Sequence, residues 1–306
     1  MEKIIDENVM HTIITDDGKI LGWTTHADSG EVLPPELLKR FHEGAGFEDN
    51  LASYDYYDHH DIFYLCVPEA LKDSDSLPQF GAYISKSEVL IMYTHWEDRV
   101  NDFIPELLKT VITKKFSIQR AMLSVIDFLT KNDGKHLSKI SETIISLEAE
   151  IMKSADTELK GKNDKIILFR QQLHPMQKMY EQLIDALDDL MENENGMFSE
   201  TDIKYALRIH NRVERLYKTV LNMKDYVTQV REAYQSQIDI GLNSIMKIFT
   251  VLSAVFLPLT LLAAWYGMNF EHQPEFGWRY GYIGVIAVSL MIIFSCVLFF
   301  KSKKWF

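Results

Sequence analysis

LLAAWYGMNFEHQPEF, residues 261–276, separates two apolar segments near the end of this 306-residue chain. Residues 245–266 before it and residues 280–300 after it are each long enough to cross a bilayer, since a hydrocarbon core requires about 20 apolar residues of helix. The link, residues 267–279, is polar, and its backbone amides could not stay unpaired in lipid. The sequence therefore predicts two transmembrane helices joined by a short loop outside the hydrocarbon.

Lysines flank these segments on one side of the predicted membrane. Lys301, Lys303 and Lys304 follow the second segment and Lys247 lies at the entry to the first, whereas the loop contains only Arg279. Because positive charge is retained in the cytoplasm, both termini are expected there, with the loop outside. The N-terminal residues lack a signal peptide, so we expect a multi-pass protein of the cell (inner) membrane.

The composition limits the possible functions. The chain has 44 acidic and 32 basic residues, a formal net charge of -12. This opposes a nucleic-acid binder, which needs clustered Lys and Arg. An acidic body suits cations, although many soluble proteins are simply acidic. Two cysteines, Cys66 and Cys296, do not make a disulfide framework or a cysteine zinc site.

The residues up to about 100 predict an α/β region. An Asp-Gly turn at residues 17–18 indicates a hairpin, and prolines at the first turn of residues 34–41 favour a short helix. β-Branched and aromatic runs bounded by turn residues predict further strands. The expected strands are residues 10–14, 19–23, 62–67, 80–85 and 89–93.

The segment YDYYDHHD, residues 54–61, offers candidate ligands for a transition metal in His59, His60 and Asp61. Adjacent residues of a strand point to opposite faces, which prevents these side chains from readily meeting at one ion. We therefore favour a solvated, structural role.

Helical periodicity dominates after residue 97. Helices are expected over residues 100–130, with an interruption near Pro105, and over 136–160, 164–194 and 199–266. Ser199 and Asp202 resemble a capping box at the start of the last one. The predicted organisation is a cytosolic α/β domain with an acidic helical hairpin (1–198), a stalk helix (199–244), transmembrane helix 1 (245–266), a loop (267–279), transmembrane helix 2 (280–300) and a basic tail (301–306).

The last long helix would measure roughly 100 Å at 1.5 Å per residue. As a lone cytosolic stalk it would expose an apolar stripe, so self-association is expected. The stripe comprises Val213, Leu216, Val220, Met223, Val227 and Val230.

Carboxylates gather around the end of the predicted hairpin. Such a run is usually a solvated helix face, but it can also face the basic tail or collect divalent cations. The residues are Asp185, Asp188, Asp189, Glu192, Glu194, Glu200 and Asp202.

Small and weakly polar residues recur every 3.5 positions along the first transmembrane segment. They form one face of a supercoiled helix, which either packs closely against a second helix or lines a pore in a ring of subunits. Met246 and Leu257, with Phe249 if the helix rotates, are the candidate gates. We call this face the seam: Asn243, Met246, Thr250, Ser253, Leu257, Thr260, Ala264 and Gly267.

The YGMN sequence at residues 266–269, followed by FEHQPE, resembles the signature and loop of the CorA family of magnesium transporters. Its position just after the first of two C-terminal spans strengthens the resemblance, which is detailed over about the last 65 residues. Asn243, Met246-Lys247, Pro258-Leu259-Thr260 and the Lys-rich tail are similar too. The resemblance implies a homopentamer whose selectivity residues are Gly267, Met268 and Asn269, with Met268 mainly positional.

The seam has no carboxylate between Asn243 and Asn269. Magnesium gives up its octahedral water shell reluctantly, so amide and carbonyl oxygens of Gly267 and Asn269 are expected to bind the hydrated ion through its water. Glu271 and Glu275 would concentrate cations outside the pore.

We therefore predict a channel for hydrated Mg2+, gated by cytosolic divalent cation through carboxylates that the sequence does not identify. A relative moving Co2+, Ni2+ or Zn2+ is the nearest alternative, and a membrane-anchored scaffold is another. No enzyme motif, nucleotide-binding loop or cofactor site is found in the sequence.

Overall fold

The computed structural model describes residues 11–14, 18–24, 35, 51–67, 78–94, 106–107, 110, 114, 116–153, 161–268 and 277–303. The chain divides into two compact units. The first contains residues 1–150 and 160–231, and the second contains residues 151–159 and 232–306.

A mixed sheet forms the β part of the first unit. Its described strands are β1 (His11–Ile14), β2 (Ile20–Thr24), β3 (Ala52–Tyr56), β4 (Asp61–Cys66), β5 (Gln79–Ile84) and β6 (Glu88–Thr94). Their order is β1-β2-β6-β5-β4-β3, in which β2 and β6 are parallel and the other neighbours antiparallel. Every residue of β4, which pairs with β3 on one side and β5 on the other, is buried.

The five predicted strands are confirmed, each within one residue of its expected bounds. Gly18 has a φ of 81°, which explains the glycine in the turn between β1 and β2. Strand β3 was not predicted, because its sequence ASYDY has weak strand character of its own. It is held by pairing with β4 and by contact with a helix. The helix predicted over residues 34–41 lies outside the described residues except for Pro35.

The described helices are α3 (Gln119–Lys131), α4 (Asp133–Lys153), α5 (Lys162–Glu192), α6 (Glu200–Tyr266) and α7 (Gly281–Ser302). The helix expected over residues 100–130 is wrong in its middle, since residues 116–118 are not helical and α3 begins only at Gln119. The Asn-Asp-Gly sequence at residues 132–134 separates α3 from α4 by one residue only, because α4 already begins at Asp133. The carboxylate of Asp133 is favourable there, since a helix N-terminus carries partial positive charge.

The predicted capping box at the start of α6 is confirmed. The amide of Asp202 donates to Ser199 Oγ at 3.3 Å, and the Asp202 carboxylate accepts from the amide of Ser199 at 3.3 Å. These two bonds satisfy amides that the first helical turn leaves without partners.

The predicted exposure of the apolar stripe on α6 is wrong. All six of its residues are buried, and Val213 and Val220 are fully inaccessible. They pack inside a group of helices whose polar contacts include Arg212 of α6 with Asp127 of α3, and Tyr226 of α6 with Glu148 of α4. The stripe therefore stabilises the single chain and gives no argument for self-association.

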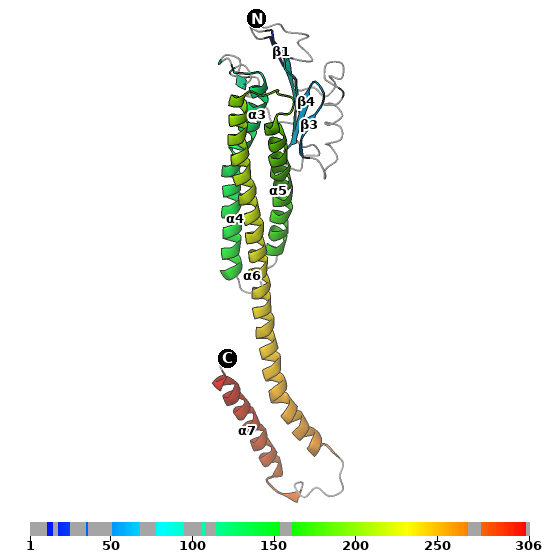
Figure 1. The fold of residues 1–306 in the computed structure, drawn as a ribbon. Coiled ribbons are helices and arrows are strands. Elements are labelled where there is room, and N and C mark those ends of the chain that lie inside the picture. Colours follow the sequence, from blue (N-terminus) through cyan, green and yellow to red (C-terminus); the bar gives the residue numbers. More distant parts are fainter. Residues whose placement is uncertain are drawn as a thin grey trace. The chain divides into compact units, whose positions relative to one another are not determined.

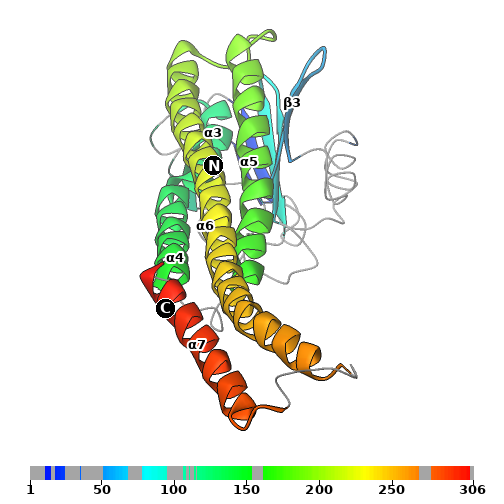
Figure 2. The same ribbon diagram turned by 90° about the horizontal axis from the view of Figure 1, so that it is seen from below.

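Helix α5 connects this group to the sheet, as Figures 1 and 2 both show. Its Gln182 Oε1 accepts hydrogen bonds from the amides of Leu51 and Ala52, at 2.6 and 3.1 Å. Tyr56 of β3 donates its hydroxyl proton to the carbonyl of Asp189. These bonds fix the edge strand β3 to the C-terminal half of α5.

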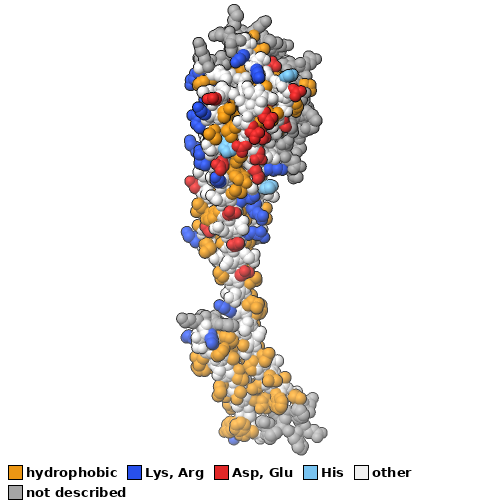
Figure 3. All heavy atoms as spheres, in the orientation of Figure 1, with side chains coloured by type: hydrophobic (Ala, Val, Ile, Leu, Met, Phe, Trp, Pro, Cys, Tyr) orange, Lys and Arg blue, Asp and Glu red, His pale blue; other side chains and the backbone are white. Residues whose placement is uncertain are grey.

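The second unit contains the C-terminal part of α6 and all of α7. Both helices are long and apolar enough to cross a membrane, and their most apolar stretches are almost entirely exposed in the single chain. Figure 3 shows apolar side chains gathered over these two segments. Such surface is compatible with lipid or with further copies of the chain, and not with water.

Candidate functional site: the seam of helix α6

The seam residues of α6 are all exposed in the single chain. Met246 and Leu257 are 66% and 71% accessible, and the other six are exposed too. The half-buried residues of the same stretch lie on another face, where Val251, Ala254, Pro258 and Leu262 are found. Since Cys296 of α7 contacts Ala254, that second face is the one turned toward α7. The seam is thus free to meet other chains.

Two hydroxyls on the seam are oriented by their own helix. Thr250 Oγ1 donates to the carbonyl of Met246 and Thr260 Oγ1 to the carbonyl of Phe256, both at 2.8 Å. Each hydroxyl proton is therefore used inside the helix, and the oxygen lone pairs remain available outside it. A face built in this way can accept hydrogen bonds from water.

Gly267 ends α6 in a crowded position. Its amide donates to the carbonyls of Ala263 at 2.9 Å and Ala264 at 3.2 Å. A Cβ at residue 267 would lie 3.2 Å from the Ala263 oxygen, which is closer than ordinary contact. Glycine therefore lets the chain leave the helix without displacing its last carbonyls. Met268 follows and is half exposed.

Several predicted site residues lie outside the described residues: Asn269, Glu271, Glu275 and Lys304. Of the basic tail, Lys301 and Lys303 are exposed, and Lys301 lies in the last turn of α7. A cation suits the partial negative charge of a helix C-terminus.

A cavity of about 460 Å³ lies between the two helices near the loop. Its lining is apolar, with Tyr266 and Trp278 at one end and Gly281 and Gly284 along α7. Among the residues that the structure describes, those lining the cavity carry no carboxylate.

The chain was compared with known proteins. The profile of the family described as "CorA-like Mg2+ transporter protein" matches residues 41–304. The chain belongs to this family. The match begins in the first unit and ends in the basic tail, so CorA membership extends well beyond the C-terminal signature from which it was inferred.

Individual CorA relatives agree with this assignment. The "Cobalt/magnesium transport protein CorA" of Thermotoga maritima is 29% identical over 74% of this chain and 64% of its own length. A "Magnesium transport protein CorA" of Wolinella succinogenes is 26% identical over 80% of this chain and 85% of its own. Other relatives, such as that of Yersinia pestis, match over only about a third of either chain, at 38% identity.

A solved structure supports the same fold. The complete CorA magnesium transporter from Methanocaldococcus jannaschii superimposes with a TM-score of 0.76, covering 99% of this chain and 95% of that one. The sequence identity is 19%, so this likeness concerns the fold. The fold is therefore that of CorA: an α/β N-terminal region, a long helix and two C-terminal apolar helices.

The seven acidic residues between the end of α5 and the first turn of α6 behave in two ways. Six of the seven are exposed, in accordance with a solvated helix face. Partial burial and the carboxylates of Glu192, Asp185, Asp188 and Asp55 raise the pKa of Asp189. Partial burial and the carboxylates of Asp189, Glu192, Glu194 and Asp61 raise the pKa of Tyr56 to about 12. These two side chains therefore hold their protons to a higher pH than they would in water.

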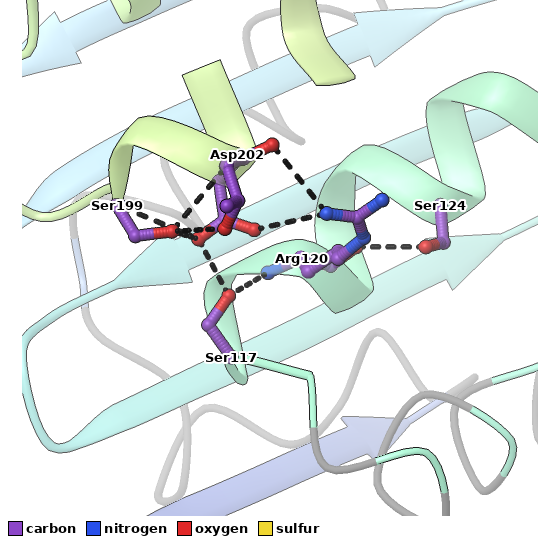
Figure 4. Close-up of polar contacts among 6 residues, drawn as sticks. Ser117, Arg120, Ser124, Ser199 and Asp202 are labelled. Carbon is purple, nitrogen blue, oxygen red and sulfur yellow. Dashed lines mark hydrogen bonds and ion pairs between the residues drawn. The ribbon is translucent and has the colours of Figure 1, made fainter. Parts of the chain in front are cut away.

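Asp202 is the exception, being only 1% exposed. Figure 4 shows its carboxylate between Ser199, Ser117 and Arg120. It accepts from Ser199 Oγ at 2.6 Å and Ser117 Oγ at 2.7 Å, and pairs with Arg120 at 3.5 Å. With these partners it is a structural residue of the CorA fold and not part of the acidic surface.

The residues of the YDYYDHHD segment do not form a metal site. Asp61 is buried and accepts from Tyr54 Oη and Asn195 Nδ2, both at 2.6 Å. The His60 ring lies 4.7 Å from those of Tyr57 and Tyr83. Within the described residues there is no group of three or more metal-ligating side chains. The structural role predicted for the segment is right, but Asp61 is not solvated.

Proposed function

We propose that this chain is a subunit of a magnesium channel that conducts hydrated Mg2+ across the membrane, down its electrochemical gradient. The observation that carries the proposal is the seam of α6, which is exposed along its whole length and has no carboxylate. Membership of the CorA-like Mg2+ transporter family indicates that the transported ion is Mg2+. The chain is a transporter subunit with no catalytic role and no cofactor.

One chain supplies two membrane helices, which cannot enclose a pore. Several copies must therefore meet around an axis, and the family resemblance favours five. The seam is the face that suits this axis, because the opposite face of α6 is occupied by α7. The apolar surface of α7 then faces lipid.

The chemistry of the seam favours a hydrated ion over a bare one. Removing the waters of Mg2+ would require charged oxygen ligands, and the described seam offers hydroxyl oxygens and backbone carbonyls. Thr250 and Thr260 present oxygen lone pairs to a water shell. At the outer end, Gly267 and Asn269 are proposed to select the ion by the size of its shell.

Apolar rings are proposed to close the pore. Met246 and Leu257 are the most exposed large apolar residues of the seam, and a narrow ring of such side chains excludes water and therefore a hydrated ion. Phe249 is exposed on an adjacent face and would join the ring if α6 rotated.

We propose that the loop lies outside the cell and that both termini are cytoplasmic, because of the lysines at the ends of the membrane helices. A membrane potential of 100 mV then provides about 4.6 kcal/mol for inward movement of a divalent ion. Glu271 and Glu275 attract cations to the outer mouth. Cytosolic Mg2+ is proposed to regulate closure through the acidic domain.

The decisive experiment is Mg2+ flux into liposomes that contain the purified full-length chain. Asn269→Ala and Gly267→Ala are expected to reduce flux at least tenfold with normal oligomer size. Gln273→Ala, which removes an amide in the same loop outside the YGMN sequence, is the matched control. Full flux in the Asn269 variant, or a monomer in detergent and lipid, would refute the proposal.

Cobalt is the second candidate ion. The Thermotoga relative carries cobalt in its name, and the seam contains no group that distinguishes hydrated Co2+ from hydrated Mg2+. Competition by Co2+, Ni2+ and Zn2+ in the same flux assay decides between the ions. Uptake of one of these with no uptake of Mg2+ would overturn the choice of magnesium.

A further inference from the structure

Pro258 interrupts the hydrogen bonds inside α6. It lies within the helix, four residues after Ala254. In a regular helix the amide of residue 258 would donate to the carbonyl of residue 254, but proline has no N–H. The Ala254 carbonyl is therefore left without its helical donor, at a depth where no water is available in a membrane.

The thiol of Cys296 on α7 lies 3.7 Å from this same carbonyl oxygen and donates to it. Both residues are half-buried, so the contact is partly shielded from the surroundings. The side-chain hydroxyls of three residues in the same two helices act differently from this thiol. They donate to carbonyls of their own helix, and the residues are Thr250, Thr260 and Ser289. The Cys296 bond joins α7 to α6 at the turn that the proline weakens.

We propose that Cys296 is a positioning residue for the pore. Its thiol takes the place of the amide that Pro258 lacks and holds the interrupted turn of α6 against α7. Leu257 and Thr260, on the seam beside Pro258, are oriented by that turn. A helix bends most easily where its hydrogen-bond ladder is broken. A fixed turn therefore keeps the Leu257 side chains of all subunits at the same level around the pore.

This inference rests on the proposed pore, but the contact itself can be tested without transport. The full-length chain is purified as wild type, Cys296→Ala, Pro258→Ala and the double variant. Thermal unfolding and Mg2+ flux are measured for each. Pro258→Ala restores an amide at residue 258, so it makes the thiol redundant.

Cys296→Ala is expected to lower Tm by about 2–4 °C, the size of shift that loss of one modest interaction gives in a chain of this kind. It is also expected to change flux at least twofold. Cys296→Ser, which keeps a donor, should restore both values. In the Pro258→Ala background, Cys296→Ala should change neither. Ser289→Ala, which removes a hydroxyl bonded within α7, is the control and should show no coupling to Pro258.

Equal effects of Cys296→Ala in both backgrounds would overturn the proposal, as would failure of serine to rescue. The proposal would also be overturned if the effect of Cys296→Ala on Tm depended on the residue at position 258 while its effect on flux did not, because the bond would then be structural only. If no variant, including wild type, conducts Mg2+, the proposed function fails, and any coupling in Tm then describes a contact without a role in a pore.

Discussion

Arg120 of α3 pairs with Asp202 in the first turn of α6 at 3.5 Å, and the guanidinium also lies over the rings of Phe116 and Tyr205. Asp202 is buried, so its charge depends on these partners and on the hydroxyls of Ser117 and Ser199. The pair joins the start of the long helix to the helix that packs on β6.

We predict that Asp202→Ala destabilises the first unit by about 3 kcal/mol, since removing one member of a buried ion pair leaves the other uncompensated. Chemical unfolding of the full-length protein, followed by circular dichroism, measures the loss. Glu200→Ala removes an exposed carboxylate from the same helical turn and is expected to cost well under 1 kcal/mol. Equal effects of the two substitutions would contradict this assignment.

A second prediction concerns Asp189, whose pKa is raised by partial burial and by neighbouring carboxylates. The pKa of Asp189 in the folded protein is therefore higher than in the unfolded chain. Its contribution to the stability of the fold is fully present below about pH 4 and is lost as the pH rises through the folded-state pKa. Asp189→Asn should therefore raise Tm at pH 7, and the gain should disappear near pH 4.

Thermal unfolding between pH 4 and pH 8 checks the Asp189 prediction. Asp225→Asn makes the same change of charge at an exposed position of α6 and serves as the control. A gain from Asp189→Asn that stays constant over this range, or that Asp225→Asn reproduces, would show that the carboxylates around Asp189 are not its cause.

Local rules predicted much of this fold. The capping box of Ser199 and Asp202, the turn at Gly18 and the two long apolar helices at the C-terminal end each depend on residues close in sequence, and all are found in the structure. The helix break at residues 116–118 was missed because it depends on a distant contact, between Ser117 and Asp202, which periodicity does not show.

Two further wrong predictions have a common cause. The stripe around Val213 and Val220 was interpreted as a surface for other copies, and Asp61 as a solvated residue, because a sequence does not tell which elements cover which face. The stripe is buried where α4 and α5 lie beside α6, with Glu148 and Gln177 in contact with α6, and Asn195 covers Asp61 (Figures 1 and 2). The residues proposed for ion selection, among them Asn269, stay predictions.

A third prediction tests the role of Asp61. Asp61→Ala removes the acceptor of the Tyr54 hydroxyl and one of the two acceptors of Asn195 Nδ2, which keeps the carbonyl of Tyr57, and should cost about 2 kcal/mol of stability. Addition of Co2+ or Ni2+ should give the same Tm shift in wild type and in Asp61→Ala. Loss of a metal-dependent shift specifically in the variant would restore the metal-site interpretation that we rejected.

The last prediction concerns Thr260, whose hydroxyl donates to the Phe256 carbonyl and presents its oxygen to the seam. Thr260→Val has nearly the same shape but no oxygen, so a hydrated ion would lose one water acceptor from every subunit at this level of the pore. We expect Mg2+ flux to fall severalfold while oligomer size stays normal. Thr260→Ser keeps the oxygen and should retain most of the flux.

The matched control for Thr260→Val is Ala263→Val, which adds apolar bulk at an exposed position off the seam and should leave flux unchanged. If Thr260→Val conducts like wild type, the oxygen at this position does not contact the hydrated ion, and the seam would have to be rotated relative to the pore axis.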